Sequence, residues 1–224
     1  MNTVETVVEN YDKVLSEVKT LSPNATLVLA SKMVSKEVLQ GLASCRKVIY
    51  GENRVQELLS KYFESESLTW HFIGRLQTNK VKYIVDKVSL IQSVDSVRLA
   101  EEIEMRSAGI GKTMDILVEV NVGEEASKGG VSESELDGLL EAVSHMPHLR
   151  LLGLMSVLPD VKEEALVPLY AHLYDLFRKV AQIKKDNFDV RVLSAGMSGD
   201  YVVALKNGSN MVRLGSKVFG ARNY

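Results

Sequence analysis

Eight short apolar runs, separated by segments with helical periodicity, restrict most strongly how this 224-residue chain can fold. The runs are apolar almost throughout, whereas a strand with one wet face should alternate apolar and polar residues. Continuous apolar runs are typical of parallel strands that are covered on both faces. The expected strands span residues 26–32, 48–52, 69–74, 89–94, 115–122, 151–157, 190–194 and 211–214.

The segments between these runs carry the apolar spacing of amphipathic helices. A further helix is expected ahead of the first strand, where valine, leucine and tyrosine recur at helical spacing over residues 4–18. The expected intervening helices span residues 36–43, 54–63, 77–86, 97–107, 133–145, 163–185 and 201–206. Four residues are placed to cap helix starts, namely Ser35, Ser96, Ser132 and Asp200.

These units predict one (β/α)8 TIM barrel domain over residues 1–224, with an extra N-terminal helix. A doubly wound open sheet is the alternative. The barrel is favoured because eight strand–helix units account for the whole chain. The chain is shorter than the ~250 residues typical of such barrels, so its loops should be short. No linker rich in proline, glycine or serine divides the sequence.

Composition excludes several classes of protein. A net charge of −2 lacks the basic excess of nucleic-acid-binding proteins. No apolar stretch approaches the ~20 residues needed to cross a bilayer, and the acidic N-terminus has no signal core. The single cysteine, Cys45, permits no intrachain disulfide and is typical of a reducing compartment. We therefore expect a cytoplasmic protein that binds neither nucleic acid nor membrane.

Lys32 ends the first apolar run, which is an unusual place for a lysine. Burial favours the neutral amine, and a neutral amine attacks aldehydes to form a Schiff base. The alternative is a strand-end lysine that reaches back to solvent. In a barrel the carboxyl ends of the strands build the active site. Those ends carry polar residues, namely Lys32, Glu52, Asn53, Arg75, Ser93, Asn121, Ser156, Ser194 and Arg213.

Two segments are candidates for binding a phosphate. Residues 194–200 follow the seventh expected strand and open a helix, with two glycines for close backbone approach and the hydroxyls of Ser194 and Ser198. Gly215 and Ser216 follow the eighth expected strand. Barrels of this kind commonly hold a phosphate between the loops after strands seven and eight. An ordinary glycine–serine turn is the alternative at each place.

Arg213 lies inside an otherwise apolar run. A buried guanidinium keeps its proton and needs an acceptor, either a carboxylate or the ring nitrogen of a ligand. A lysine that binds an aldehyde, a phosphate site and a donor to a ring nitrogen together describe a site for pyridoxal 5′-phosphate (PLP).

The sequence resembles the pyridoxal-phosphate homeostasis protein family, whose members are similar to the N-terminal barrel of alanine racemase. Each matching stretch is weak alone, but so many in the same order are specific. The stretches are residues 31–32, 51–53, 55–57, 70–74, 76–77, 79–80, 91–96, 127–130, 153–155, 196–198, 200–201, 212–215 and 219–220.

This resemblance implies a monomeric barrel that carries PLP on Lys32, with Asn53 near the cofactor ring and Arg213 facing the pyridine nitrogen. Met33, Val34 and Arg54 depart from the family pattern. Ser216 stands where threonine is common and keeps the hydroxyl. The resemblance places a set of residues around the phosphate, namely Ser194, Gly196, Met197, Ser198, Gly215 and Ser216.

Other residues invite a functional interpretation. His71 is expected to be a strand-borne histidine held by a neighbouring hydrogen bond, rather than a catalytic base. His145 and His148 have the spacing of a metal pair but lack further ligands, so no metal site is expected. Lys128 is either a surface lysine or a second amine able to receive or release the aldehyde.

The leading hypothesis is a PLP carrier or buffer without catalytic residues, which contributes to vitamin B6 homeostasis and could serve apo PLP enzymes. The chain stops at Tyr224, directly after the expected barrel, whereas racemases built on this barrel need a second, β-rich domain. A PLP-dependent amino-acid racemase with weak activity is the second hypothesis. A cofactor-free lysine aldolase on a phosphate-binding barrel is the third.

Overall fold

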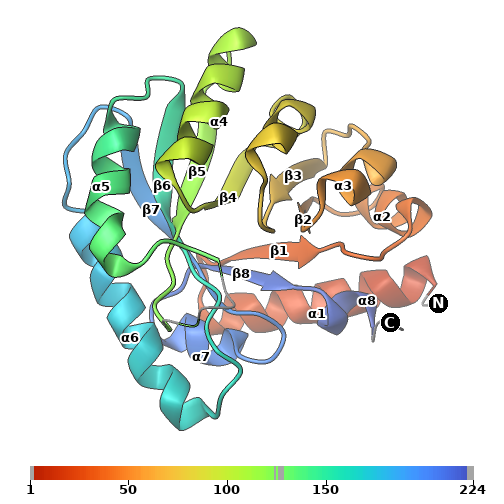
Figure 1. The fold of residues 1–224 in the computed structure, drawn as a ribbon. Helices are drawn as coiled ribbons and strands as arrows, with labels where there is room; N and C mark the ends of the chain where they lie inside the picture. The colour runs from red at the N-terminus through yellow and green to blue at the C-terminus, as the bar shows by residue number, and fades with distance from the viewer. Residues whose placement is uncertain (1–2, 124, 126–128, 221–224) are drawn as a thin grey trace.

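Eight parallel strands close into a barrel, in which each strand pairs with the next and β8 pairs with β1. The computed structural model describes residues 3–123, 125 and 129–220. Helices surround the strands in alternation along the chain (Figure 1). The predicted barrel is confirmed. The strands are β1 (Thr26–Ala30), β2 (Val48–Glu52), β3 (Leu68–Phe72), β4 (Leu90–Val94), β5 (Met114–Glu119), β6 (Leu149–Met155), β7 (Phe188–Ser194) and β8 (Met211–Leu214).

The predicted N-terminal helix, α1 (Val4–Leu21), packs beside the point where the barrel closes. It contacts α2, α7 and α8 (Figure 1) and buries Val7, Tyr11, Val14 and Val18 at helical spacing. None of the helices in the described part of the chain combines the length and apolar character needed to cross a membrane. The other helices are α2 (Lys36–Ala43), α3 (Val55–Lys61), η1 (Thr78–Tyr83), α4 (Val97–Gly109), α5 (Glu133–Ser144), α6 (Glu163–Val180), α7 (Tyr201–Lys206) and α8 (Ser216–Phe219).

Two hydrophobic clusters fill the molecule. The larger one lies between the strands and the surrounding helices, and the smaller one contains inward-facing residues such as Val28, Leu117 and Met211. Buried polar side chains, including His71 and Arg213, also come from the strands. The barrel therefore encloses a polar region that the apolar runs in the sequence do not reveal.

Gly153 occupies a backbone position that only glycine fits. Its φ is +148°, and a Cβ there would lie 1.9 Å from the carbonyl oxygen of Val192 on β7. The β5–β6 and β6–β7 registers both shift beside this residue. Gly153 thus allows β6 to approach β7 closely where the barrel is irregular.

The helix expected over residues 77–86 is present, but as the shorter 3₁₀ helix η1 (Thr78–Tyr83). The chain then turns, and Lys112 donates from Nζ to the carbonyl oxygens of Val85 and Val88 at 2.9 and 2.6 Å. This tertiary cap satisfies carbonyls that a longer helix would have bonded internally.

Other boundaries differ from prediction for local reasons. The first strand ends at Ala30, not at Lys32, because the chain turns after the Ser31 N–H bonds the carbonyl of Gly51. The helix expected over residues 163–185 ends at Val180. The four-residue helix α8 was not predicted.

Gly153→Ala should lower the free energy of unfolding by at least about 2 kcal/mol, because the new Cβ must displace the Val192 carbonyl. Urea denaturation would measure the change. Gly138→Ala is the matched control, since Gly138 lies in α5 with open space around its Cβ position. That substitution should stabilise the protein by about 0.5–1 kcal/mol. Equal effects at both sites would contradict the role given to Gly153.

Candidate functional site

A cavity of about 400 Å³ opens at the carboxyl ends of β6, β7 and β8. It contains five of the site residues expected from the sequence, and its volume suits a small ligand. The β6–α6 loop, which sequence reasoning did not select, supplies Leu158, Asp160 and neighbouring residues. The expected residues that line the cavity are Met197, Ser198, Arg213, Gly215 and Ser216.

Asp200 shapes the loop after β7. Its carboxylate accepts the Met197 N–H at 2.6 Å and the hydroxyl of Tyr170 from α6. Asp200 is the N-cap residue of α7, as expected, but its side chain makes no capping hydrogen bond, because its two oxygens accept from Met197 and Tyr170. The expected caps at Ser35 and Ser96 are confirmed, since each hydroxyl accepts an N–H from the first turn of its helix.

The loops after β7 and β8 contact each other. Ser198 Oγ accepts the N–H of Gly215 at 3.4 Å, and α8 begins at the next residue, Ser216. The first N–H groups of any helix have no partner within it. Gly196 supports the same loop, because its φ of +103° brings it close to α7 and a Cβ would lie 2.6 Å from that of Ala204. Ser198, Gly215 and the first residue of α8, Ser216, therefore lie together at the cavity.

Arg213 is buried, with only 4% of its surface exposed. Nη1 donates to the carbonyl oxygen and to Oγ of Ser194 at 2.9 and 2.7 Å, and Nη2 donates to the carbonyl oxygen of Ser156 at 2.9 Å. Burial lowers the pKa of the guanidinium from its ordinary value, but an arginine remains protonated at neutral pH. Arg213 therefore brings a fixed positive charge to the cavity wall.

A chain of hydrogen bonds continues from Arg213 across the barrel. Ser194 Oγ donates to Gln92 Oε1 at 2.7 Å, and Gln92 Nε2 lies 3.0 Å from His71 Nδ1. Burial lowers the pKa of His71 to about 3, so the imidazole is neutral. His71 thus has the expected place on a strand, with a hydrogen-bonding neighbour. Ser194 lies beneath Arg213 and is not among the residues that line the cavity.

Lys32 lies in the turn after β1 and is half-buried. It is not part of the cavity lining, although Ala30, two residues earlier, is. The following residue, Met33, has a φ of +62°, and it is the only residue other than glycine with a positive φ in the described ranges. A left-handed conformation at methionine is costly and persists only where surrounding contacts impose it.

Those contacts come from a buried ionic network. Lys61 Nζ donates to the Ser31 carbonyl at 2.8 Å and pairs with Glu52 and Glu57 at 2.6 and 3.1 Å. Glu57 accepts the Met33 N–H at 3.1 Å, while Glu52 accepts the Ser31 hydroxyl at 2.7 Å. Burial raises the pKa of Glu52, and the bonds from Lys61 and Ser31 oppose that effect. The network holds the backbone on both sides of Lys32.

Asn53 follows β2 and is half-buried, and its N–H donates to Glu52 Oε2 at 3.2 Å. Neither Asn53 nor Gly196 lines the cavity. His148 bonds Glu104 and His145 bonds the backbone of Glu141, so the two histidines have separate partners. Lys128 lies outside the described residues.

Glu119, at the end of β5, was not selected from the sequence, although a carboxylate inside an apolar run is a visible signal. Its exposed fraction is 6%, and a Cβ on Gly129 would lie 3.1 Å from Oε1. Burial, aided by the charge of Asp95, raises the pKa of Glu119 to about 7, against opposing effects of Arg213 and Arg75. The carboxyl is therefore partly protonated near neutral pH.

Comparison with known proteins agrees with this architecture. A family profile described as the alanine racemase N-terminal domain matches residues 10–223. A pyridoxal phosphate homeostasis protein of Aquifex aeolicus is 43% identical over 207 residues, covering 89% of this chain and 88% of that protein. One from Vibrio alginolyticus is 34% identical over 214 residues, covering 91% and 89%. The structure of PipY from Synechococcus elongatus PCC7942 with PLP bound has a TM-score of 0.85 at 27% identity, covering 96% of this chain and 100% of that one.

The closed barrel and the profile match define a protein of the alanine racemase N-terminal-domain class. Within that class, the extent and identity of the matches show that the chain belongs to the pyridoxal phosphate homeostasis protein family. The family resemblance found in the sequence is thereby confirmed.

Glu119→Gln should change how stability depends on pH. Because the pKa of Glu119 is raised in the folded state, its stabilising contribution is complete below about pH 4.5 and is lost as pH rises through about 7. The neutral glutamine does not titrate. The unfolding free energy of the variant relative to wild type should therefore increase between pH 5 and pH 8, by on the order of 2 kcal/mol.

Urea denaturation at the two pH values would test this prediction. Glu101→Gln, on the exposed surface of α4, is the control for the removal of a carboxylate. A constant difference between Glu119→Gln and wild type would mean that Glu119 stays ionised throughout.

Proposed function

We propose that the protein binds PLP reversibly and contributes to PLP homeostasis as a carrier or buffer. The observation that carries the proposal is the cavity at the ends of β6–β8, where a fixed guanidinium, two serine hydroxyls and the start of a helix meet. The PLP-bound structure of PipY, which is 27% identical over almost the whole chain, supports the choice of ligand.

The donors around the cavity fit the cofactor. Ser198, Ser216 and the backbone around Gly215 offer hydroxyl and N–H donors for a phosphate, with Met197 lining the same wall. Arg213 would present its charge to the pyridine nitrogen. Ser194 and Gly196 would act by holding Arg213 and the loop after β7.

Lys32 is the proposed covalent anchor, with Asn53 near the ring. When bound, the cofactor would supply an aldehyde carbon that a lysine amine can attack. The left-handed residue Met33 and the Lys61 network fix the turn that carries Lys32 next to Ala30, which lines the cavity. This rigid turn supports an anchor of defined position.

We propose a carrier rather than an enzyme. A guanidinium that keeps its proton leaves the ring nitrogen unprotonated, and an unprotonated ring withdraws electrons weakly from a substrate. The matching family profile is nevertheless that of the alanine racemase N-terminal domain. A weak racemase is therefore the second candidate.

The physiological setting is part of the same proposal. We expect a cytoplasmic monomer that could pass the cofactor to apo PLP enzymes, in keeping with the near-balanced charge and the single cysteine. Light scattering after size-exclusion chromatography would test the monomer, and a stable dimer would contradict it.

Purified wild-type protein loaded with PLP should absorb visible light and retain the cofactor after borohydride reduction. Lys32→Ala should lose both properties while keeping its circular dichroism spectrum. Lys36→Ala is the matched control, since Lys36 lies four residues further on and its Nζ donates to the Tyr62 carbonyl. Peptide mapping that places the reduced cofactor mainly on Lys128 or any other lysine would refute the assignment.

Incubation of the PLP-loaded protein with L-alanine in heavy water separates the carrier from the racemase. We expect the cofactor to be released slowly. NMR should detect negligible exchange of the α-proton for deuterium. Deuterium incorporation at an ordinary enzymatic rate, on the order of 10 per second, would establish the racemase instead.

A further inference from the structure

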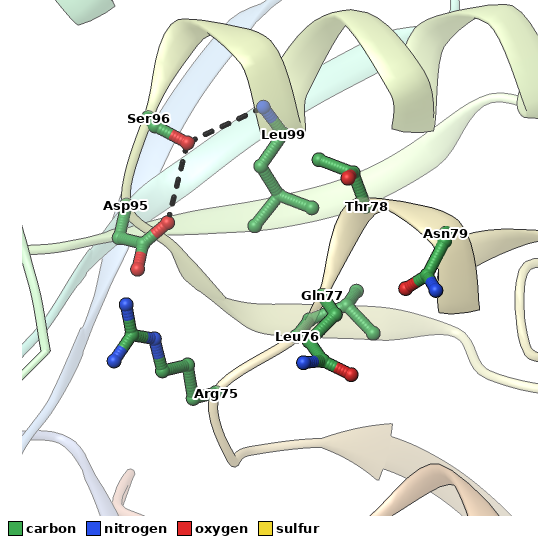
Figure 2. A pocket seen from close by; sticks show the side chains of 8 residues that line it. All are labelled: Arg75, Leu76, Gln77, Thr78, Asn79, Asp95, Ser96 and Leu99. Carbon is green, nitrogen blue, oxygen red and sulfur yellow. Dashed lines mark hydrogen bonds between the residues drawn. The ribbon is translucent and has the colours of Figure 1, made fainter.

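A second cavity, of about 700 Å³, lies where the β3–η1 segment faces the β4–α4 junction (Figure 2). It shares no lining residue with the cavity assigned to the cofactor. Three sequence stretches that match the family, residues 76–77, 79–80 and 91–96, contribute residues to its lining. The cavity is lined by Arg75, Leu76, Gln77, Thr78, Asn79, Asp95, Ser96 and Leu99.

One cation and one anion face each other in this cavity. Figure 2 shows the guanidinium of Arg75 pointing toward the carboxylate of Asp95. Within the described part of the chain, the two side chains line the same space without forming a salt bridge with each other. Arg75 is exposed and Asp95 is half-buried, so both charges are accessible to a ligand.

The backbone on both sides of the cavity is fixed. Gly74, directly before Arg75, packs so closely on Asn53 that a Cβ would lie 2.3 Å from its carbonyl oxygen, and the Gly74 carbonyl accepts Ser93 Oγ at 2.6 Å. Ser96, directly after Asp95, accepts the Leu99 N–H at 3.3 Å and so caps α4. The two charges are therefore held on rigid supports.

The remaining lining residues divide into polar and apolar groups. The amides of Gln77 and Asn79 provide donors and acceptors, and both residues are exposed. Leu76 and Leu99 are buried and provide apolar surface. Such a lining suits a small polar molecule with a short carbon skeleton.

The pair of charges selects the class of ligand. A simple anion would be attracted by Arg75 but repelled by Asp95. A simple cation would be attracted by Asp95 but repelled by Arg75. A zwitterion with a carboxylate and an ammonium group satisfies both, since arginine binds carboxylates well and Asp95 can accept from an ammonium. We propose that this cavity binds a free α-amino acid, with the carboxylate on Arg75 and the ammonium group on Asp95.

Binding to cofactor-free, full-length protein tests the proposal independently of the proposed function, because no PLP is present to react with an amine. L-Alanine, propionate and ethylamine are titrated separately and followed by NMR chemical shifts. L-Alanine should bind saturably, and propionate and ethylamine, which each carry one of its two charges, should bind at least tenfold more weakly. Equal affinity for propionate would identify an anion site and overturn the proposal, as would the absence of L-alanine binding.

Substitutions locate the site. Arg75→Gln and Asp95→Asn should each weaken L-alanine binding at least tenfold, equivalent to about 1.4 kcal/mol. Arg98→Gln is the matched control, since Arg98 is an exposed arginine at the start of α4 that does not line the cavity. Circular dichroism checks that each variant is folded. Unchanged affinity in both cavity variants would place the amino acid elsewhere and refute the assignment.

Discussion

The burial of the Arg213 guanidinium is the constraint on which the organisation of this barrel depends. A charge inside a protein is costly unless hydrogen bonds replace the lost water. Here Ser156 and Ser194 supply carbonyl oxygens from the ends of β6 and β7, and Ser194 adds its hydroxyl. The barrel must therefore close accurately at β6–β8 for the charge to be accommodated, and the cavity at these strand ends takes its shape from the same closure.

Other buried polar groups are connected to Arg213 by hydrogen bonds or by electrostatic interactions. One route runs through Ser194 and Gln92 to the neutral His71, inside the barrel. Arg213 also acts over a distance on Glu119. Arg213 and Arg75 lower the pKa of this carboxyl, whereas Asp95 raises it. Charged residues that line both cavities thus influence the pKa of Glu119.

The sequence predicted the barrel because parallel strands buried on both faces leave continuous apolar runs, and it predicted where the polar strand ends would gather. It did not reveal partners that depend on tertiary approach. The acceptors of Arg213 include backbone carbonyls, which every residue has, so the sequence does not indicate them. The sequence of the helix that contains Lys61 does not show that its Nζ bonds the Ser31 carbonyl. Likewise, the cap from Lys112 that follows the 3₁₀ helix η1 comes from a distant segment. The assignments of Lys32 and Asn53 remain predictions.

The closure of β8 onto β1 has a consequence for biosynthesis. The proposed anchor, Lys32, follows the first strand of the barrel to be synthesised, whereas Arg213 and the loop after β8 belong to the last strand unit of the barrel. A nascent chain exposes its lysine long before the guanidinium and the loop that would retain the cofactor exist. Unfinished or truncated chains should therefore compete poorly for the ligand, and retention would begin only once the barrel is closed.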